Sequence, residues 1–233
     1  MSVEDKMILF RNYDLWCHFS DEDYMELHVI HNFIEAKKGD YIYFDSHYHN
    51  KLYFLKEGYI KIGYIDESGK EVIKEIIQKG ELFGQITLEK SNLNGEFAQA
   101  YKGDVSLCSF NIEDFQKLLK TKPVLAIEYT KRVGNKLMVI QNRLINLLNK
   151  DVKTRLINFF AQLVEQNIGD KHGEGFCIPN YLTHEDIANL IGSTRQTVTT
   201  MINELEKEDV LSYSRNQICF LDVKKIQKLV TVA

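Results

Sequence analysis

Six hydrogen-bonding side chains share one face of a predicted helix in the C-terminal third of the chain. They are Thr194, Arg195, Gln196, Thr199, Thr200 and Asn203. An arginine guanidinium fits the O6 and N7 acceptors of guanine, and a glutamine amide can pair with N6 and N7 of adenine. No acidic residue occurs between Ser193 and Asn203, although the whole chain has a formal net charge of −4. A helix that meets a phosphate backbone needs such a face, so the pattern predicts contact with DNA.

Two short predicted helices position this face. Thr183 is a suitable N-cap for the first helix, because Asp186 lies three residues later and can return a hydrogen bond to the backbone. Gly192 is expected to end it, since glycine adopts the left-handed conformation without a Cβ clash. Ser193 is expected to cap the second helix, with Gln196 in the reciprocal position. The second helix buries apolar residues at helical spacing, namely Val198, Met201, Ile202 and Leu205.

Residues 182–211 therefore predict a helix-turn-helix, whose second helix can lie in the DNA major groove. An ordinary helical hairpin inside a larger core is the alternative, and the agreement of cap, turn and apolar spacing favours the first interpretation. The alternating residues that follow predict a hairpin in the position of a wing, with Ser214, Arg215 and Asn216 at its tip. A closing helix is expected over residues 223–230.

The charge of this region is unusual for a DNA-binding domain. Residues 151–233 contain nine Lys and Arg but eleven Asp and Glu. A basic domain is the usual electrostatic sign of nucleic-acid binding. Attraction must therefore come from locally placed cations, and we expect weaker non-specific binding than for a basic domain. The candidate cations are Lys153, Arg155, Arg195 and Arg215.

The chain of 233 residues suits one large domain or two smaller ones, and it has no apolar run long enough to span a bilayer. The first residues, MSVEDKM, lack the basic and apolar pattern of a secretory signal, which predicts a cytoplasmic protein. The four cysteines have no metal-ligand spacing; they are Cys17, Cys108, Cys177 and Cys219. We interpret them as reduced thiols in the core, and we expect no cofactor.

Residues 36–110 follow a period of two and are rich in Tyr, Phe, Ile and Val. Glycine-containing reversals recur along them, at Gly39, Gly58, Gly69 and Gly80. Short strands at this spacing predict an antiparallel jelly-roll β domain. Residues 1–35 are expected to form a short helical segment before it, in which Ser20 starts a helix.

A long helix beginning near Pro123 carries mostly apolar residues separated alternately by four and three positions. They are Ala126, Thr130, Val133, Leu137, Ile140, Leu144 and Leu147. This heptad seam predicts pairing with a second copy, and packing on the chain's own β domain is the alternative. Asp151 can cap the next helix and marks a hinge. The predicted fold class is α+β, with a β-roll sensor over residues 1–120, a dimerisation helix and hinge over 121–150, and a winged helix-turn-helix over 151–233.

This order of elements resembles the Crp/Fnr family of bacterial transcription regulators, named after the catabolite activator and the fumarate–nitrate reduction regulator. The resemblance covers nearly the whole chain, and its most specific parts are LTHEDIANLIGSTRQTVTTMINELEKEDVL and KGELFGQ. It implies a sequence-specific transcription regulator with a cyclic-nucleotide-binding-like domain. Such a protein acts as a homodimer on a palindromic operator in double-stranded DNA and contacts RNA polymerase. The small-molecule effector is left open.

The resemblance assigns roles to residues of the second helix and the wing. Arg195 matches the arginine that contacts guanine in cyclic-AMP-type members. Gln196 stands where those members have a glutamate that accepts from cytosine, so its preference is expected to move to adenine. Thr200 replaces a second arginine, so one strong base contact is missing. The residues that match phosphate-contacting or wing-tip positions are Thr183, Thr194, Thr197, Ser214 and Arg215.

The resemblance also locates a ligand pocket, whose residues are Gly84, Gln85, Asn94, Gly95 and Glu96. Cyclic-AMP binders have a carboxylate at the position of Gln85 and an Arg-Ser pair near the position of Glu96. No arginine occurs between Arg11 and Arg132. A phosphate facing Glu96 without a guanidinium is unfavourable, so we predict no tight cyclic-nucleotide binding.

Other interpretations of the β domain stay open at this point. A cupin-like metalloenzyme would use the histidine pair of residues 47–49, but Glu57 lies too far along the chain and the next histidine is His172. A haem or redox gas sensor would take axial ligands from among His18, His28 and His31. Solvated histidines, including His47 and His49, are the simpler account, so we predict no enzyme activity and no metal.

Overall fold

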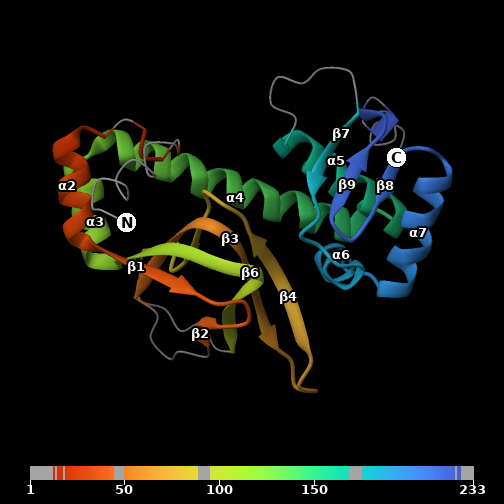
Figure 1. Cartoon of the computed structure of the whole chain (residues 1–233), viewed down its shortest axis with the longest axis horizontal. Helices are drawn as coiled ribbons and strands as arrows, with labels where there is room; N and C mark the ends of the chain where they lie inside the picture. The colour runs from red at the N-terminus through yellow and green to blue at the C-terminus, as the bar shows by residue number, and fades with distance from the viewer. Residues whose placement is uncertain are drawn as a thin grey trace. The chain divides into compact units, whose positions relative to one another are not determined.

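The computed structural model describes Tyr13 and residues 15–17, 19–44, 50–88, 95–167, 175–223 and 225–226 (Figure 1). Its contacts divide the chain into two compact units, Met1–Met138 and Val139–Ala233. The division falls within one long helix, α4 (Pro123–Asn149). No helix among the described residues is both long enough and apolar enough to cross a lipid bilayer.

An antiparallel sheet of six strands dominates the described part of the first unit (Figure 1). Its strands are β1 (His31–Ala36), β2 (Tyr41–Phe44), β3 (Lys51–Ile65), β4 (Glu71–Ile77), β5 (Leu82–Gly84) and β6 (Glu96–Asn111). The main path runs β1-β6-β3-β4, while β2 pairs with β6 and β5 pairs with β3. The two longest strands, β3 and β6, pair with each other along most of their length. The register of this pairing shifts at Glu57, as at a β-bulge, and both strands also pair with other neighbours. The predicted antiparallel β domain is confirmed.

Two details of the predicted β region are wrong. Helix α2 (Asp21–Ile30) ends five residues before the predicted boundary, because the next segment pairs with β6 as strand β1. Gly58 is not a chain reversal, since β3 continues through it with a shift of register. Its φ is 88°, and a Cβ at this position would lie 2.7 Å from Asp104 O. The glycine is therefore needed where β3 approaches β6 too closely for a side chain.

Among the described residues, two hydrophobic clusters form the core of the first unit. One contains the aromatic rings of Tyr43, Tyr53 and Phe83 inside the β domain. The other joins α2, α3 (Ile112–Thr121) and the start of α4 to the sheet. Its largest fully buried residues are Trp16, Tyr24, Phe54, Phe110 and Phe115. The predicted helix start at Ser20 is confirmed, because Asp23 N donates to Ser20 Oγ at 3.2 Å and Ser20 N donates to the Asp23 carboxylate at 2.9 Å.

The first half of α4 packs on the β domain. Leu125 and Tyr129 are buried in the second cluster. Lys136, about two turns further along, forms an ion pair with Glu75 at 2.8 Å. One face of this half is therefore engaged within the first unit.

The second unit contains α5 (Val152–Asn167), α6 (His184–Ile191) and α7 (Arg195–Lys207). Its sheet has the order β7 (Phe176–Pro179), β9 (Gln217–Phe220) and β8 (Leu211–Tyr213). Asp151 caps α5 as predicted, since Thr154 N donates to its carboxylate at 2.8 Å. Backbone hydrogen bonds to the carboxylate hold the pKa of Asp151 below its ordinary value. Of the predicted closing helix, Val223, Lys225 and Ile226 are described and helical.

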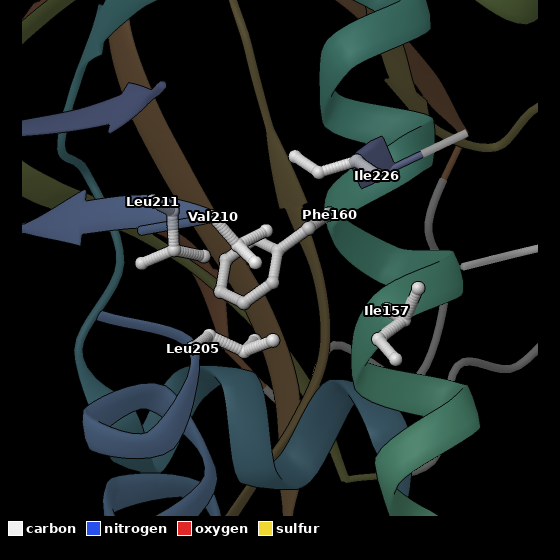
Figure 2. A pocket seen from close by; sticks show the side chains of 6 residues that line it. All are labelled: Ile157, Phe160, Leu205, Val210, Leu211 and Ile226. Atoms are coloured by element: carbon white, nitrogen blue, oxygen red, sulfur yellow. The ribbon is translucent and has the colours of Figure 1, made fainter. Parts of the chain in front are cut away.

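A small hollow lies in the core of the second unit, between α5, α7 and the start of β8 (Figure 2). It is lined by Ile157, Phe160, Leu205, Val210, Leu211 and Ile226. All six side chains are apolar, so the hollow offers no group that could orient a ligand. We assign it to the packing of the domain.

The prediction of four reduced core cysteines is wrong. Cys177 and Cys219 form a disulfide, although 42 residues separate them in the sequence. They meet because β7 and β9 pair with these two residues directly opposite each other. Cys17 is exposed, and Cys108 is a buried thiol outside the disulfide, as predicted.

Candidate nucleic-acid interface

Helix α6 begins and ends at the predicted residues. Thr183 Oγ1 accepts a hydrogen bond from Asp186 N at 3.1 Å, and the Asp186 carboxylate accepts from Thr183 N at 2.6 Å. Gly192 adopts φ 66° in the left-handed region, and Ser193 N donates to Ala188 O at 2.8 Å. The capping box and the glycine stop are both confirmed.

The N-cap of α7 is Thr194 and not the predicted Ser193. Thr194 Oγ1 accepts from Thr197 N at 3.2 Å. Thr194 has the extended backbone of an N-cap, whereas the Ser193 N–H closes the end of α6 and cannot take the reciprocal bond predicted from Gln196. Arg195 and Gln196 are consequently the first two residues of the helix. The predicted buried face is confirmed for Val198, Ile202 and Leu205, while Met201 is half-buried.

The structure brings the predicted base-contacting residues together on an exposed surface. Thr194, Arg195, Gln196, Thr200 and Asn203 are exposed, and Thr197 and Thr199 are half-buried. No acidic residue lies in the first turn of α7. The positive end of the helix dipole therefore coincides with the guanidinium, which suits a surface that meets phosphates.

Threonine hydroxyls on this surface are oriented by the helix itself. Thr199 Oγ1 donates to Arg195 O at 2.9 Å, and Thr200 Oγ1 donates to Gln196 O at 3.1 Å. A threonine whose hydroxyl bonds back to its own helix has a fixed side-chain rotamer. Thr200 is thus better suited to an apolar contact through its methyl group than to donating a hydrogen bond.

Two arginines secure the C-terminal end of α6. Arg143 donates to Asn189 O at 3.1 Å and Arg155 donates to Gly192 O at 3.2 Å. Cations at this end complement the negative pole of the helix. Arg155, predicted as a phosphate-facing cation, is therefore engaged within its own domain.

We expect Gly192→Ala to destabilise the second unit by about 1–2 kcal/mol, because the left-handed conformation is strained for a residue with a Cβ. The added Cβ would also lie 2.6 Å from Leu147 Cδ2. Thermal unfolding of the purified variant measures the effect. Gly134→Ala is the matched control: a Cβ there meets nothing within 4 Å on a helix, so a gain of up to about 1 kcal/mol is expected. Equal effects of the two substitutions would contradict the claim that Gly192 is needed for its left-handed backbone conformation.

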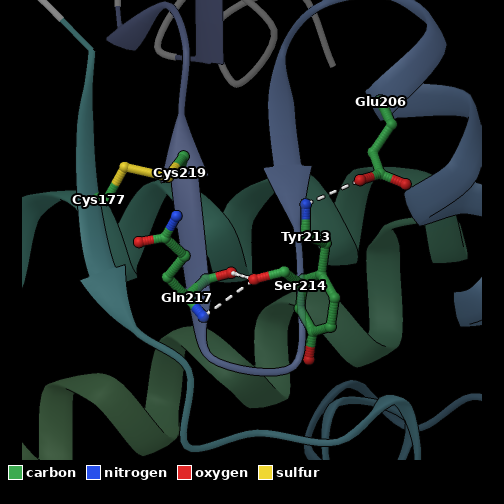
Figure 3. The surroundings of a disulfide bond; sticks show 6 residues. All are labelled: Cys177, Glu206, Tyr213, Ser214, Gln217 and Cys219. Atoms are coloured by element: carbon green, nitrogen blue, oxygen red, sulfur yellow. Dashed lines mark hydrogen bonds between the residues drawn. A yellow bond between two sulfur atoms is a disulfide. The ribbon is translucent and has the colours of Figure 1, made fainter.

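The wing is tied to both helices of the motif. Tyr213 N donates to the Glu206 carboxylate of α7 at 2.8 Å (Figure 3), and Tyr213 Oη donates to Leu182 O at 2.8 Å, just before α6. Burial raises the pKa of Tyr213 to about 12. Ser214 is used inside the turn, since its hydroxyl donates to Gln217 O and accepts from Gln217 N (Figure 3). Arg215 is exposed at the tip.

His184 is a residue of this surface that the sequence analysis missed. Its Nδ1 lies 2.8 Å from Thr199 Oγ1, and its ring centroid lies 4.9 Å from that of Tyr213. Because the Thr199 hydroxyl donates to Arg195 O, its oxygen accepts from His184 Nδ1–H. His184 therefore joins α6, α7 and the wing. The sequence shows His184 only as the first helical residue after the N-cap Thr183, and nothing in that position predicts its contacts with Thr199 and Tyr213.

Acidification should destabilise the second unit through His184. Burial, and then the charge of Arg195, lower the pKa of His184 below 6.5. As the pH falls through 6.5, the unfolded chain takes up a proton that the folded chain still resists, so the free energy of unfolding decreases. The loss should stay below about 1 kcal/mol, because the ring is partly screened by water. Thermal melts between pH 7.5 and 5 should show a smaller decrease in stability for His184→Gln than for the wild type. Equal decreases in the two proteins would disprove the role of His184 in the pH dependence.

The predicted ligand-pocket residues are only partly described. Asn94 lies outside the described residues. Gln85 is buried, and its amide donates to Thr87 Oγ1 at 2.7 Å. Glu96 accepts from Tyr43 Oη at 2.8 Å and pairs with Lys74 at 2.7 Å. The carboxylate that replaces the phosphate clamp is therefore already engaged by the protein.

Aromatic rings occupy the interior beside these residues. Tyr53 stacks on Phe83 with ring centroids 5.0 Å apart, and Tyr43 stacks on Tyr53 at 5.9 Å. Burial raises the pKa of Tyr53 to about 12. Burial and the Glu96 carboxylate raise the pKa of Tyr43 far above its ordinary value. Gly84 and Gly95 both have positive φ and shape the turns at either side.

The predicted seam of α4 divides between two environments. Ala126 and Val133 are half-buried, and Thr130 donates its hydroxyl to Ala126 O at 2.8 Å. The seam residues beyond them expose between 38% and 55% of their surface; they are Leu137, Ile140, Leu144 and Leu147. Further exposed apolar residues on the helix are Val124, Ile127, Met138, Val139, Ile145 and Leu148. The helix thus presents an apolar surface broader than the predicted seam.

The histidines proposed as metal or haem ligands are not tested by the structure. Residues 45–49 lie outside the described residues, as do His18 and the side chains of His28 and His31. Within the described parts, no group of three His, Cys, Asp or Glu side chains is placed to hold a metal ion.

Comparison with known proteins gives two family matches. Residues 154–229 match the Crp-like helix-turn-helix domain, and residues 33–122 match the cyclic nucleotide-binding domain. The chain is 28% identical over 178 residues to the global nitrogen regulator of Nostoc sp., covering 76% of this chain and 79% of that protein. It is 25% identical over 162 residues to the cAMP-activated global transcriptional regulator CRP of Pasteurella multocida, covering 69% and 76%.

Solved structures share the architecture. A CooA mutant from Carboxydothermus hydrogenoformans superimposes with a TM-score of 0.71 at 21% identity, covering 91% of each chain. FixK2 from Bradyrhizobium japonicum gives a TM-score of 0.71 at 17% identity, covering 86% of this chain and 97% of that one. The order of β domain, long helix and winged helix-turn-helix is therefore common to all three.

Proposed function

Because the chain belongs to the Crp/Fnr family of DNA-binding transcription regulators, we propose that it acts as a homodimer on a palindromic site in double-stranded DNA. The observation that carries the proposal is the exposed, acid-free N-terminal face of α7 on a fully capped helix-turn-helix. A two-fold dimer presents this face twice, about 34 Å apart, to successive major grooves.

Each half-site is recognised by three neighbouring side chains. Arg195 pairs with O6 and N7 of a guanine, and Gln196 pairs with N6 and N7 of an adenine. The methyl group of Thr200 contacts a thymine methyl, because its hydroxyl is bonded to Gln196 O. Thr183, Thr194, Thr197, Ser214 and Arg215 lie near the phosphates and fix the register.

The exposed apolar face of α4 forms the dimer interface. Leu137, Leu144 and Leu148 expose 55%, 55% and 73% of their surface in the single chain. Large apolar side chains at helical spacing are costly to leave in water. A second copy of the same helix covers them by isologous pairing. Residues 1–120 then form the sensor, 121–150 the dimerisation helix and hinge, and 151–233 the DNA-binding domain.

The β domain responds to an effector other than cyclic AMP. We expect isothermal titration with cyclic AMP to show no saturable binding up to about 1 mM, because Glu96, held by Tyr43 and Lys74, stands where the phosphate clamp would be and no arginine occurs between Arg11 and Arg132. The stacked rings of Tyr43, Tyr53 and Phe83 form part of the core beside Glu96. Micromolar affinity for cyclic AMP would overturn this prediction. The same titration with a cyclic-AMP-activated relative is the positive control.

The protein works in the cytoplasm, where the chromosome is, and contacts RNA polymerase from its operator. Whether it activates or represses depends on the position of that operator. No catalytic role is needed for this function, and neither a cofactor nor a metal is assigned.

Selection of duplexes from a randomised library by the purified protein tests the proposed function. The expected product is a palindrome whose half-sites contain guanine, adenine and thymine, with centres about 10 base pairs apart. Recovery of single, non-repeated sites would overturn the dimeric mode. If no duplex is enriched, the acidic chain does not bind DNA sequence-specifically, and the proposed function is wrong.

A further inference from the structure

The disulfide between Cys177 and Cys219 lies on the solvent side of the wing sheet (Figure 3). Their neighbours along the strands, Ile178, Ile218 and Phe220, are buried. Successive side chains of a strand point to opposite faces, so the two sulfurs lie away from the core. Cys177 is exposed and Cys219 is half-buried. Small molecules in water can therefore reach the bond.

This bond encloses the whole DNA-contacting motif. The segment between Cys177 and Cys219 contains α6, α7 and β8, which are both helices and the first strand of the wing. The two Cα atoms are 4.0 Å apart at directly opposed positions. Facing residues of an unlinked antiparallel pair lie about 4.5–5.5 Å apart, so the linked pair is only slightly closer than the sheet already brings it. The thiols can therefore join with only a small movement of the backbone.

The strand that carries Cys177 also holds the wing and the start of α6. Three residues later, Asn180 N donates to Asn216 O at 2.9 Å, and Asn180 Nδ2 donates to Ser214 O at 2.6 Å. Asn180 Oδ1 accepts from Leu182 N at 2.8 Å, directly before the N-cap of α6. Strand β7 has four residues and lies at the edge of its sheet. A covalent link at its centre therefore fixes the wing tip against α6.

We propose that Cys177 and Cys219 form a reversible thiol–disulfide exchange site whose co-reactant is a low-molecular-weight disulfide, and that the disulfide form binds DNA more tightly. The inference rests on the proposed function, because it requires DNA recognition in a compartment where thiols are normally reduced. In such compartments, protein disulfides are usually transient and serve catalysis or redox sensing.

The exchange conserves atoms and electrons. The Cys177 thiolate attacks one sulfur of the small disulfide, forming a mixed disulfide and releasing one small thiolate. The Cys219 thiolate then attacks Cys177 Sγ and releases the second small thiolate. Two electrons pass from the protein to the small disulfide, and the two cysteine protons convert the released thiolates to thiols. Excess small thiol reverses both steps.

Reduction should weaken DNA binding without abolishing it. In the reduced form β7 keeps its pairing with β9, its buried Ile178, the contact of Phe176 with Phe220 and the bonds of Asn180, but it loses its covalent link, so the wing is ordered for a smaller fraction of the time. If that fraction lies between a third and a tenth, the apparent affinity for DNA falls about three- to tenfold. The helix-turn-helix keeps its own caps and core, so binding itself persists.

The test uses the full-length protein with the duplex that it selects from a random library. Mixtures of reduced and oxidised glutathione set the redox state, alkylation with mass spectrometry counts the thiols, and fluorescence anisotropy gives the affinity. We expect reversible loss of two alkylatable thiols on oxidation, together with three- to tenfold tighter binding. Cys177→Ser and Cys219→Ser should each bind as the reduced protein does and ignore the redox state. Cys17→Ser, which removes an exposed cysteine of the other unit, should respond as the wild type does.

Three results would overturn the inference. The first is a bond that stays formed or stays absent across all glutathione mixtures. The second is equal DNA affinity in the two redox states, which leaves the proposed function intact. The third is no duplex binding in either state, which overturns the proposed function as well. The redox response of the disulfide and the DNA affinity in each redox state are both measured on the wild-type protein. Poor folding of a serine variant therefore does not affect these two tests.

Discussion

Replacing Arg195 by alanine is expected to weaken operator binding by about 30-fold to 10⁴-fold. A bidentate arginine–guanine pair contributes about 1–3 kcal/mol per base pair, and a dimer makes the contact twice. Each 1.4 kcal/mol is about a tenfold change in affinity. Arg195 is exposed at the first position of α7, and no acidic residue in that turn competes for it. Fluorescence anisotropy with the selected duplex measures the loss.

The pattern of the loss matters more than its size. If Arg195 recognises guanine, the variant should also lose discrimination at that base pair alone. Lys207→Ala is the matched control, since it removes a positive charge from the last turn of the same helix. We expect it to change affinity less than about threefold, because only a remote phosphate contact can be lost. Equal weakening of Arg195→Ala on selected and scrambled duplexes would reassign Arg195 to the DNA backbone.

Introducing a charge on the exposed face of α4 is expected to have the second large effect. Ile145 exposes 52% of its surface in the single chain, so Ile145→Asp should leave the protomer folded. In the proposed dimer it places two carboxylates in an apolar interface, which is strongly unfavourable. Sedimentation analysis should show monomers. The operator affinity should fall at least about 100-fold, because the second half-site no longer adds to the first.

Asn135→Asp provides the control, since it adds the same charge at an exposed position of the same helix. At about 100° per residue, position 135 lies some 80° from Ile145 around the helix axis. We expect this variant to remain dimeric. Monomeric behaviour of both variants would mean that net charge, and not the apolar face, controls association.

Local signals in the sequence located the helix-turn-helix well. The capping box of Thr183 and Asp186 and the stop at Gly192 depend on residues at most four positions apart, so the sequence contains everything that determines them. The N-cap of α7 was displaced by one residue. Ser193 and Thr194 are both residue types that cap helices well, and the structure places Ser193 in the turn that closes α6, where its N–H donates to Ala188 O.

Features that depend on distant pairing were harder to predict. The sequence pattern predicts a turn at Gly58, because the feature that requires a glycine there, the close approach of β6 at Asp104, lies more than 40 residues away in the chain. The seam of α4 was placed from spacing alone. Packing of Leu125 and Tyr129 on the β domain decides which face of the helix remains exposed.

The cysteine pair could have been found from the sequence. Residues 176–178 read FCI and residues 218–220 read ICF. In an antiparallel pairing of these two stretches, identical residues face each other, and the structure has this register. A search for such mirror-image stretches flanking the helix-turn-helix would have placed the two cysteines side by side.

Helix α4 also limits how the protein can evolve. One continuous helix carries the packing surface of the β domain in its first half and belongs to the second unit after Met138. Insertion of one residue near Met138 would turn everything that follows by about 100° and carry Ile145 and Leu148 off the face that includes Ile127. Insertions of seven or eleven residues nearly restore that face, with about 20° of residual rotation. Loops of this protein can therefore drift in length over generations, whereas the length of α4 is close to frozen.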